Sequence, residues 1–284
     1  MSPDSVSRTP APDLPANKPV SAGTAVGAQP WTRMTYRDLP RLTVADISAN
    51  WTRLHAGQGL QAPVPGPLAE GWALYHSGEF EQAAAIGLAH GSEGLTLANQ
   101  ATAIYANYLE PREAIRRLLF RQVIERATAQ ALAEPDNCQA LYWQAYALGR
   151  YSQGVSVARA LAQGFGGRVK GALERVIALQ PQHAEAHIAL GTFHAEVIDK
   201  VGALVGRMTY GVRADVAVQH YERGLELNPQ SAIALMEYAR GKIMLHGDAC
   251  LQDAKRLYEK AAAIEPADAR ERLDVEMARA GLKE

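Results

Sequence analysis

Three histidines on one short stretch are the first candidates for chemistry. In "HAEAHIALGTFHAE", His183, His187 and His194 fall within about 40° of one another around a helix. Two histidines four residues apart on a helix face are a spacing that zinc sites use. His187 and His194, however, are separated by a rise of about 10 Å, which is too far for ligands about 2 Å from one ion. We therefore predict no metal here, and we interpret His183 as a helix cap and the other two as packed side chains.

A second group combines aromatic, basic and acidic side chains. Tyr142, Tyr146 and Arg150 follow one another at four-residue steps, so they share one face of a helix. Such a mixture on one surface suits a peptide or a small organic ligand. The same register on two later helical stretches adds three more residues, and the predicted ligand-binding set is Tyr142, Tyr146, Arg150, Thr192, Glu196 and Arg240. The alternative is that the two tyrosines only pack between helices.

The sequence contains no motif that is typical of an enzyme active site. It contains no Gly-x-Ser-x-Gly motif, and nothing in the sequence places a cysteine beside a histidine. The glycine-rich "GFGG" is not followed by Lys-Ser or Lys-Thr, so it is not a P-loop. We predict a non-enzymatic protein without a cofactor, and we keep a metal-dependent enzyme centred on His183 and His187 as the weakest alternative.

The elements that position these residues are marked by four prolines. Pro135, Pro181, Pro229 and Pro266 stand 46, 48 and 37 residues apart, and each ends one helical pattern and opens the next. Apolar or small residues precede each proline at the spacing of one helix face. Self-similarity at this period is typical of stacked helical hairpins, in which each unit buries its apolar face only against its neighbours. The predicted fold is all-α, a right-handed superhelix of stacked antiparallel helix pairs, with His183 at the cap position after its proline.

Two stretches carry a family resemblance. "GWALYHSGEFEQAA" and "AVQHYERGLELNP" resemble pieces of a tetratricopeptide repeat (TPR), with a small residue in the first helix, a glycine turn, an aromatic residue and a closing proline. Small residues recur ten positions after three of the prolines, at Ala145, Gly191 and Ala239. The resemblance covers roughly residues 68 to 270. It implies a TPR-like α-solenoid whose first helices line a concave groove that holds the ligand.

The spacing departs from that pattern. A standard unit has about 34 residues, so two intervals carry about 12 and 14 extra residues. These lie in "SQGVSVARALAQGFGGR" and "DKVGALVGRMTYGVRAD". Lengthened inter-helix segments of this kind are similar to those of TPR subunits associated with TRAP transporters and of regulators of microtubule dynamics. The apolar part of the second segment could cover the groove, dock a neighbouring subunit or touch a membrane. The main alternative function is therefore a structural assembly protein that uses residues 200–212 as an oligomer interface.

Composition sets the remaining expectations. We divide the 284 residues into a disordered Pro/Ala/Ser-rich tail (1–40), a helix with a linker strap (41–67) and the repeat domain (68–284), with Thr43 capping the first helix. A net charge of −1 gives no attraction to nucleic acid. The chain lacks 18 consecutive apolar residues, so no transmembrane segment is expected. Two distant cysteines suit the cytoplasm, and the expected partner is a protein, a peptide or a small molecule, with a homo-oligomer possible.

Overall fold

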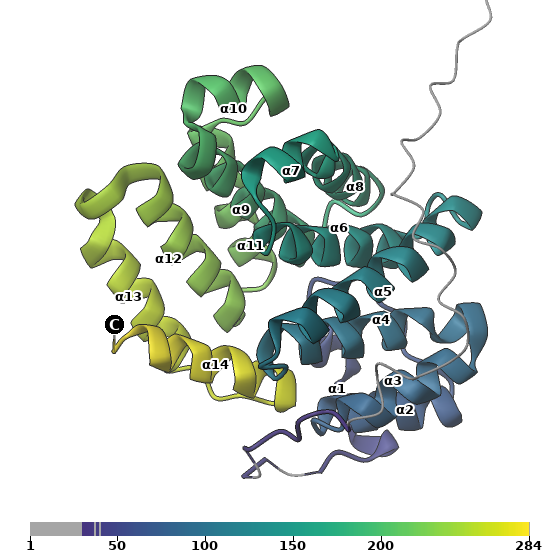
Figure 1. The fold of residues 1–284 in the computed structure, drawn as a ribbon. Helices are drawn as coiled ribbons and strands as arrows, with labels where there is room; N and C mark the ends of the chain where they lie inside the picture. The colour runs from purple at the N-terminus through teal and green to yellow at the C-terminus, as the bar shows by residue number, and fades with distance from the viewer. Residues whose placement is uncertain (1–29, 37, 40, 284) are drawn as a thin grey trace, which may run out of the picture.

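The protein is an array of antiparallel helix pairs. A computed structural model describes residues 30–36, 38–39 and 41–283, and within these residues the regular elements are all helices and no strand occurs. The pairs are α2 (Pro67–His76) with α3 (Phe80–Ala89), α4 (Gly91–Tyr108) with α5 (Glu113–Ala133), α6 (Cys138–Gln153) with α8 (Phe165–Leu179), α9 (Ala184–Val201) with α11 (Ala214–Leu227), and α12 (Ala232–His246) with α13 (Leu251–Ala262). Figure 1 shows these pairs following one another around an arc.

Further helices precede, follow and interrupt this array. Helix α1 (Val44–Leu54) precedes the first pair, and α14 (Ala269–Gly281) follows the last. The two inserted segments each form a short helix, α7 (Val157–Ala162) and α10 (Ala203–Tyr210), and a 3-10 turn (Gly247–Cys250) links α12 to α13. The apolar part of the second insertion forms α10.

Side-chain caps begin four of the helices where the prolines predict a start. Asn137, His183, Ser231 and Asp268 each accept a hydrogen bond from a backbone N–H in the first turn of the following helix. For His183 the acceptor is Nδ1, 3.1 Å from the amide nitrogen of Ala186. These bonds satisfy N–H groups that have no partner inside the helix. The prediction that His183 is a cap is confirmed.

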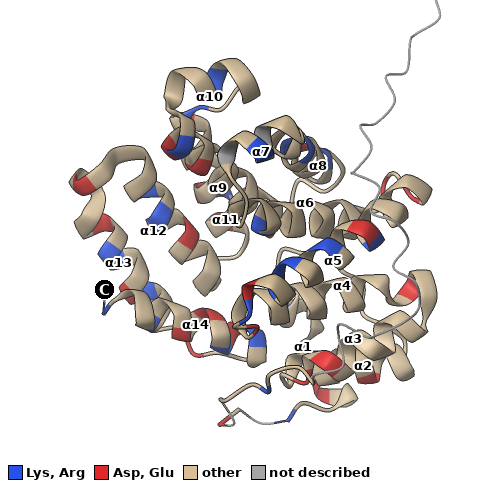
Figure 2. Ribbon diagram, viewed as in Figure 1, with Lys and Arg blue, Asp and Glu red and all other residues tan. Residues whose placement is uncertain are grey.

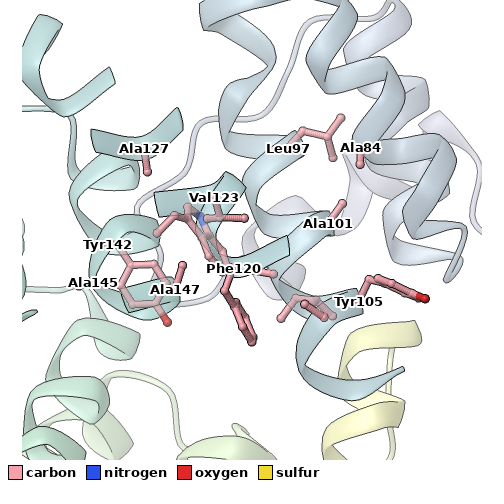
Figure 3. Close-up of a cluster of buried hydrophobic side chains, with 14 of the residues drawn as sticks. Ala84, Leu97, Ala101, Tyr105, Phe120, Val123, Ala127, Tyr142, Ala145 and Ala147 are labelled. Atoms are coloured by element: carbon pink, nitrogen blue, oxygen red, sulfur yellow. The ribbon is translucent and has the colours of Figure 1, made fainter. Parts of the chain in front are cut away.

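The core between the pairs is built from a few large side chains set among many alanines. Figure 3 shows Tyr105, Phe120 and Tyr142 packed among small residues such as Ala101 and Ala127. Small residues let helix backbones approach closely, so that the large side chains can fill the remaining space. Burying each large apolar side chain contributes about 1.5–3 kcal/mol, which makes this packing the main support of the array.

One of the predicted contact glycines shows how tight the packing is. A Cβ added to Gly191 would lie 3.0 Å from the carbonyl oxygen of Ala217 and 3.2 Å from the Tyr221 ring. Helices α9 and α11 therefore meet at a distance that only glycine permits without a shift of the neighbours.

The first and last helices of the array are joined. The His76 Nδ1 atom, at the end of α2, lies 2.6 Å from the carboxylate of Asp268, the cap of α14. Arg53 on α1 binds both carboxylate oxygens of Glu271 on α14. Figure 1 shows α14 beside α1 and α2, which closes the arc into a ring. The repeat pattern alone predicted a stack and did not indicate this closure.

The segment after α1, residues 55–66, is the strap. It runs across the end of the ring where the proline turns lie. The carbonyl oxygen of Gly57 accepts a hydrogen bond from the Ala184 amide at 2.7 Å, and that of Ala56 accepts one from Asn228 at 3.2 Å. Gln139 donates to the carbonyl oxygen of Gln58 at 2.8 Å. The strap thus ties together the starts of α6 and α9 and the end of α11.

The ordered part of the chain begins earlier than the predicted domain boundary. The tail was expected to extend to residue 40, yet Trp31 stacks on Tyr105 with ring centroids 4.1 Å apart, and Met34 is buried. Two large apolar side chains in contact with the core explain why this part of the proline-rich segment is held in place. Residues 1–29, 37 and 40 of the predicted tail lie outside the described residues. Thr43 caps α1 as expected.

Candidate functional site

The inner face of the ring encloses a cavity of about 450 Å³. Helix α9 lines it from Ala184 to Val201, which corresponds to a length of about 25 Å. Helix α6 lines it from Tyr142 to Gln153 and α8 from Phe165 to Leu173, whereas α4, α12 and α14 contribute shorter stretches. Much of the wall is apolar, supplied by Phe165, Val169, Leu173, Ile188, Phe193 and Val197.

The two ends of the cavity differ in character. We call the end near the C-termini of α6 and α9 the mouth, formed by Gln153, Ser156, Lys200, Val201 and Tyr210. We call the end near their N-termini the floor, formed by Tyr142, Glu185, Asn228, Ser231 and Arg270. The strap covers the floor, since it binds Asn228 and the backbone of Ala184.

A buried ion pair crosses the middle of the cavity. The Arg150 guanidinium donates to Glu237 Oε1 at 3.1 Å, and the Thr192 hydroxyl lies 3.4 Å from Glu237 Oε2. Arg150 also lies over the Tyr146 ring, 5.4 Å from its centroid. Burial opposes the positive charge, but Tyr146 and Glu237 outweigh it and raise the pKa of Arg150. Arg150 is therefore charged, and its partners in the wall are Glu237 and the Tyr146 ring.

Two further ion pairs line the cavity, one at the floor and one at the mouth. At the floor, Arg270 donates to Glu185 at 2.5 Å, and Gln58 of the strap donates to the same oxygen at 3.1 Å. Burial opposes ionisation of Glu185, but Arg270 lowers the pKa of this carboxyl. At the mouth, Gln153 donates to Glu196 at 2.7 Å, and Lys200 lies 3.7 Å from Glu196. Each of these wall charges thus has a partner of opposite sign.

Comparison with solved structures finds a similar fold. A thermophilic TPR protein from Thermus thermophilus superposes with a TM-score of 0.53 at 18% sequence identity, and the match covers 75% of this chain and 97% of that protein. The chain has a divergent TPR-like fold. No protein-family model matches the sequence, and no curated protein matches it either.

The TPR-like array brings together five of the six residues predicted to bind a ligand. Tyr142, Tyr146, Arg150, Thr192 and Glu196 all line the cavity. Tyr142 is buried, and burial together with the nearby Glu185 carboxylate raises its pKa well above the ordinary value. Its side chain therefore serves packing at the floor as well as lining the wall.

The sixth residue, Arg240, lies outside the cavity wall. It binds the Tyr258 hydroxyl at 3.1 Å and lies 3.7 Å from Glu237. The ungapped register places Met236 and Arg240 on the inner face, but Met236 is fully buried in the contact of α12 with the following helices. Helix α12 is thus rotated by one position relative to the expected register and presents Ile233 and Glu237 to the cavity.

Sequence reasoning missed several residues of the wall. Glu237 stands alone among apolar residues in "AIALMEYAR", and a search for a carboxylate to complement Arg150 would have selected it. Tyr210, an aromatic residue of the second inserted segment, lines the mouth, and its ring centroid lies 5.9 Å from that of Phe193 on α9. Arg270 comes from the last helix, and no local signal connects it to the cavity.

His187 and His194 of the TPR-like array serve packing. The His187 Nε2 atom lies 3.1 Å from the carbonyl oxygen of Pro181, and its Nδ1 lies 3.0 Å from Nδ1 of His220. His194 is buried and accepts a hydrogen bond from the Arg213 amide at 3.1 Å. Within residues 30–36, 38–39 and 41–283, no group of three or more His, Cys, Asp or Glu side chains is arranged to hold a metal ion.

Among the residues covered by the structure, no helix is both long and apolar enough to cross a bilayer. The cytoplasmic location and the closer kinship with TRAP-associated or microtubule-regulating TPR proteins stay predictions.

Proposed function

We propose that this TPR-like protein binds an elongated, mostly apolar organic ligand in the cavity along α9, without catalysing a reaction on it. The single observation that carries the proposal is the cavity itself. Its volume of about 450 Å³ lies within the range of about 300–1,000 Å³ that is typical of ligand pockets. Helical repeat arrays generally use their concave inner surface for binding.

The charges on the wall support a ligand with little charge of its own. The acidic and basic groups on the wall are engaged by oppositely charged partners, in the pairs Arg150–Glu237, Arg270–Glu185 and Lys200–Glu196. A charged ligand that displaced one partner of Arg150–Glu237 or Arg270–Glu185 would leave the other charge buried and uncompensated, which costs about 3–5 kcal/mol. An uncharged ligand leaves all three pairs intact.

The apolar wall also favours an organic ligand over a peptide. An extended peptide places an N–H and a carbonyl group at every step of about 3.3 Å, and each needs a hydrogen-bond partner when buried. Along α9 the wall offers the apolar side chains Ile188, Phe193 and Val197, while Glu185 and Glu196 already accept hydrogen bonds from other side chains. A peptide bound over this length would leave much of its backbone unsatisfied, whereas an aliphatic or aromatic chain would not.

The first test fills the cavity. Ala189 lines the middle of the cavity on α9, so Ala189→Phe should occupy the space that a ligand needs. The matched control is Ala133→Phe, at the exposed end of α5 outside the cavity wall. Binding is measured with N-phenylnaphthylamine, an uncharged probe that fluoresces in apolar surroundings. We expect Ala189→Phe to weaken probe binding by about tenfold or more, while the control leaves it unchanged. Equal affinity in both variants would reject the cavity as the site.

A second test identifies any molecule that stays bound to the protein during purification. Native mass spectrometry of the purified protein should reveal a small organic adduct that is lost in Ala189→Phe and retained in Ala133→Phe. A co-purifying peptide in place of this adduct would assign the cavity to the other predicted ligand class. Tyr146→Ala should weaken probe binding without preventing folding, because Tyr146 is only partly buried in the wall.

A further inference from the structure

Helix α10 carries an apolar face that points away from the protein. Leu204, Val205 and Met208 are 73%, 52% and 81% exposed. At about 100° per residue these three side chains share one side of the helix. Gly206 and Tyr210 lie on the opposite side, where Gly206 is buried against α9. The outward apolar face is therefore fixed by the packing of the inner face.

The same end of the ring carries positive charge. Helices α7 and α10 contain Arg159 and Arg207 and no acidic residue, as Figure 2 shows. Both arginines are exposed, and neither makes an ion pair among the described residues. The two helices flank one mouth, since Ser156 and Ala160 line the cavity from the α7 side and Tyr210 from α10.

The acidic groups near this face do not cancel that charge. Asp215 is paired with Arg213, and Glu196 lies 3.7 Å from Lys200. Asp199, exposed on the last turn of α9, is the exception. Within the described part of the chain, two unpaired arginines thus stand beside three exposed apolar side chains against one unpaired aspartate.

The exposed apolar side chains of α10 and the unpaired arginines of α7 and α10 together indicate what binds this face. A second copy of the chain would bury at most a few hundred Å² on each side through these three side chains, whereas a standard protein interface buries about 800 Å² per partner. Two like-charged α10 helices would also repel each other. An interfacial helix on an anionic membrane, by contrast, needs an apolar face flanked by Arg or Lys. We propose that α10, with α7, docks the mouth of the cavity on an anionic lipid surface.

The docking surface goes beyond ligand binding and does not require the cavity to be occupied. If both proposals hold, an apolar ligand passes between the bilayer and the mouth without crossing bulk water. Because Ala189 is inside the cavity and Met208 is outside it, the two proposals can fail separately.

The experiment is co-sedimentation of the full chain with vesicles. Vesicles of phosphatidylcholine containing phosphatidylglycerol are compared with vesicles of phosphatidylcholine alone. The test variants are Leu204→Ser combined with Met208→Ser, and Arg207→Gln. The matched control is Leu132→Ser, which replaces an equally exposed leucine at the end of α5, outside the cavity wall. All of these positions are exposed, so folding should not be affected.

We expect the unchanged protein and Leu132→Ser to bind the anionic vesicles, more weakly at high salt. The double variant should bind about tenfold less, and Arg207→Gln about fivefold less. Equal binding to the two vesicle types, no binding, or no difference between the double variant and Leu132→Ser would overturn the proposal. Light scattering that shows an oligomer lost in the double variant would also overturn it, and would assign residues 200–212 to subunit contact. In each of these cases N-phenylnaphthylamine binding reports independently on the cavity.

Discussion

Asp274 provides a quantitative test of how the ring is held closed. This residue lies on α14, is 4% exposed, and accepts a hydrogen bond from the Tyr108 hydroxyl on α4. Burial raises the pKa of Asp274 to about 7, and the nearby Arg270 offsets only part of that effect. The closing helix thus carries a carboxyl group whose charge the fold disfavours at neutral pH.

The expected magnitude follows from that pKa. An ordinary aspartate titrates near 3.8, so ionising Asp274 in the folded protein costs at most about 4 kcal/mol above pH 7. Below about pH 4 the group is protonated in both the folded and the unfolded state and contributes no penalty. Between about pH 4 and pH 7 only the folded state retains the proton, so stability contributed by Asp274 is lost as the pH rises.

The perturbation is Asp274→Asn, which removes the titration while keeping an oxygen for Tyr108. Urea unfolding is followed by circular dichroism for both proteins across this pH range. We expect the stability of Asp274→Asn relative to the unchanged protein to rise by about 2–4 kcal/mol from pH 4 to pH 8. Any fixed cost of burying the amide shifts all values equally, so the slope is diagnostic. A difference that is flat with pH would refute the reasoning.

Two histidines make the comparison of Asp274→Asn with the unchanged protein necessary, because they also change the stability with pH. Burial lowers the pKa of His55 to about 3 and that of His220 to about 4. Both rings are therefore neutral in the fold but protonated in the unfolded chain below about pH 6.5, so the stability they contribute is lost as the pH falls. This trend opposes that of Asp274 and would hide it in a single protein. It cancels in the difference between the two proteins, and Asp199→Asn, on the exposed surface of α9, controls for the substitution itself.

Three further predictions concern stability, each measured by urea unfolding. Thr43→Ala removes the bond from the Asp46 amide to the Thr43 hydroxyl, one half of a capping box, and should cost about 1 kcal/mol; no change would mean that α1 is held by the strap alone. Gly191→Val should cost about 1–3 kcal/mol because its side chain meets Tyr221, and a stabilised variant would contradict the observed helix contact. Arg270→Met should cost about 3–5 kcal/mol by stranding Glu185, whereas adding Glu185→Met should recover most of that loss; strictly additive effects would show that the two side chains do not interact.

The sequence predicts those parts of the fold that repeat. The proline spacing indicates where α6, α9, α12 and α14 begin, because a cap and a helix start are local features that each unit must provide for itself. The inner faces of α6 and α9 follow the same logic, so Tyr146 and Thr192 both line the cavity.

Contacts that occur only once in the fold could not be predicted from the sequence. Helix α12 turns a different face inward because Met236 is drawn into the contact with the helices after it, and Glu237 takes the inner position. The ring closure joins His76 to Asp268 across 192 positions of sequence, and neither residue carries a local mark of its partner. Trp31 falls in a proline-rich stretch whose composition indicates disorder, although its ring finds Tyr105. Such contacts are decided by tertiary packing, which composition and periodicity do not encode.

Joining α2 to α14 changes how the molecule should come apart. In an open solenoid the terminal units contact a neighbour on one side only, so they can peel away while the middle remains intact. In this ring neither terminal unit is free on one side. Detaching α14 also breaks the His76–Asp268 and Arg53–Glu271 contacts and separates Arg270 from Glu185. Local unfolding that starts at either α2 or α14 therefore disrupts contacts on both sides of the junction, so we expect all the helices to unfold cooperatively.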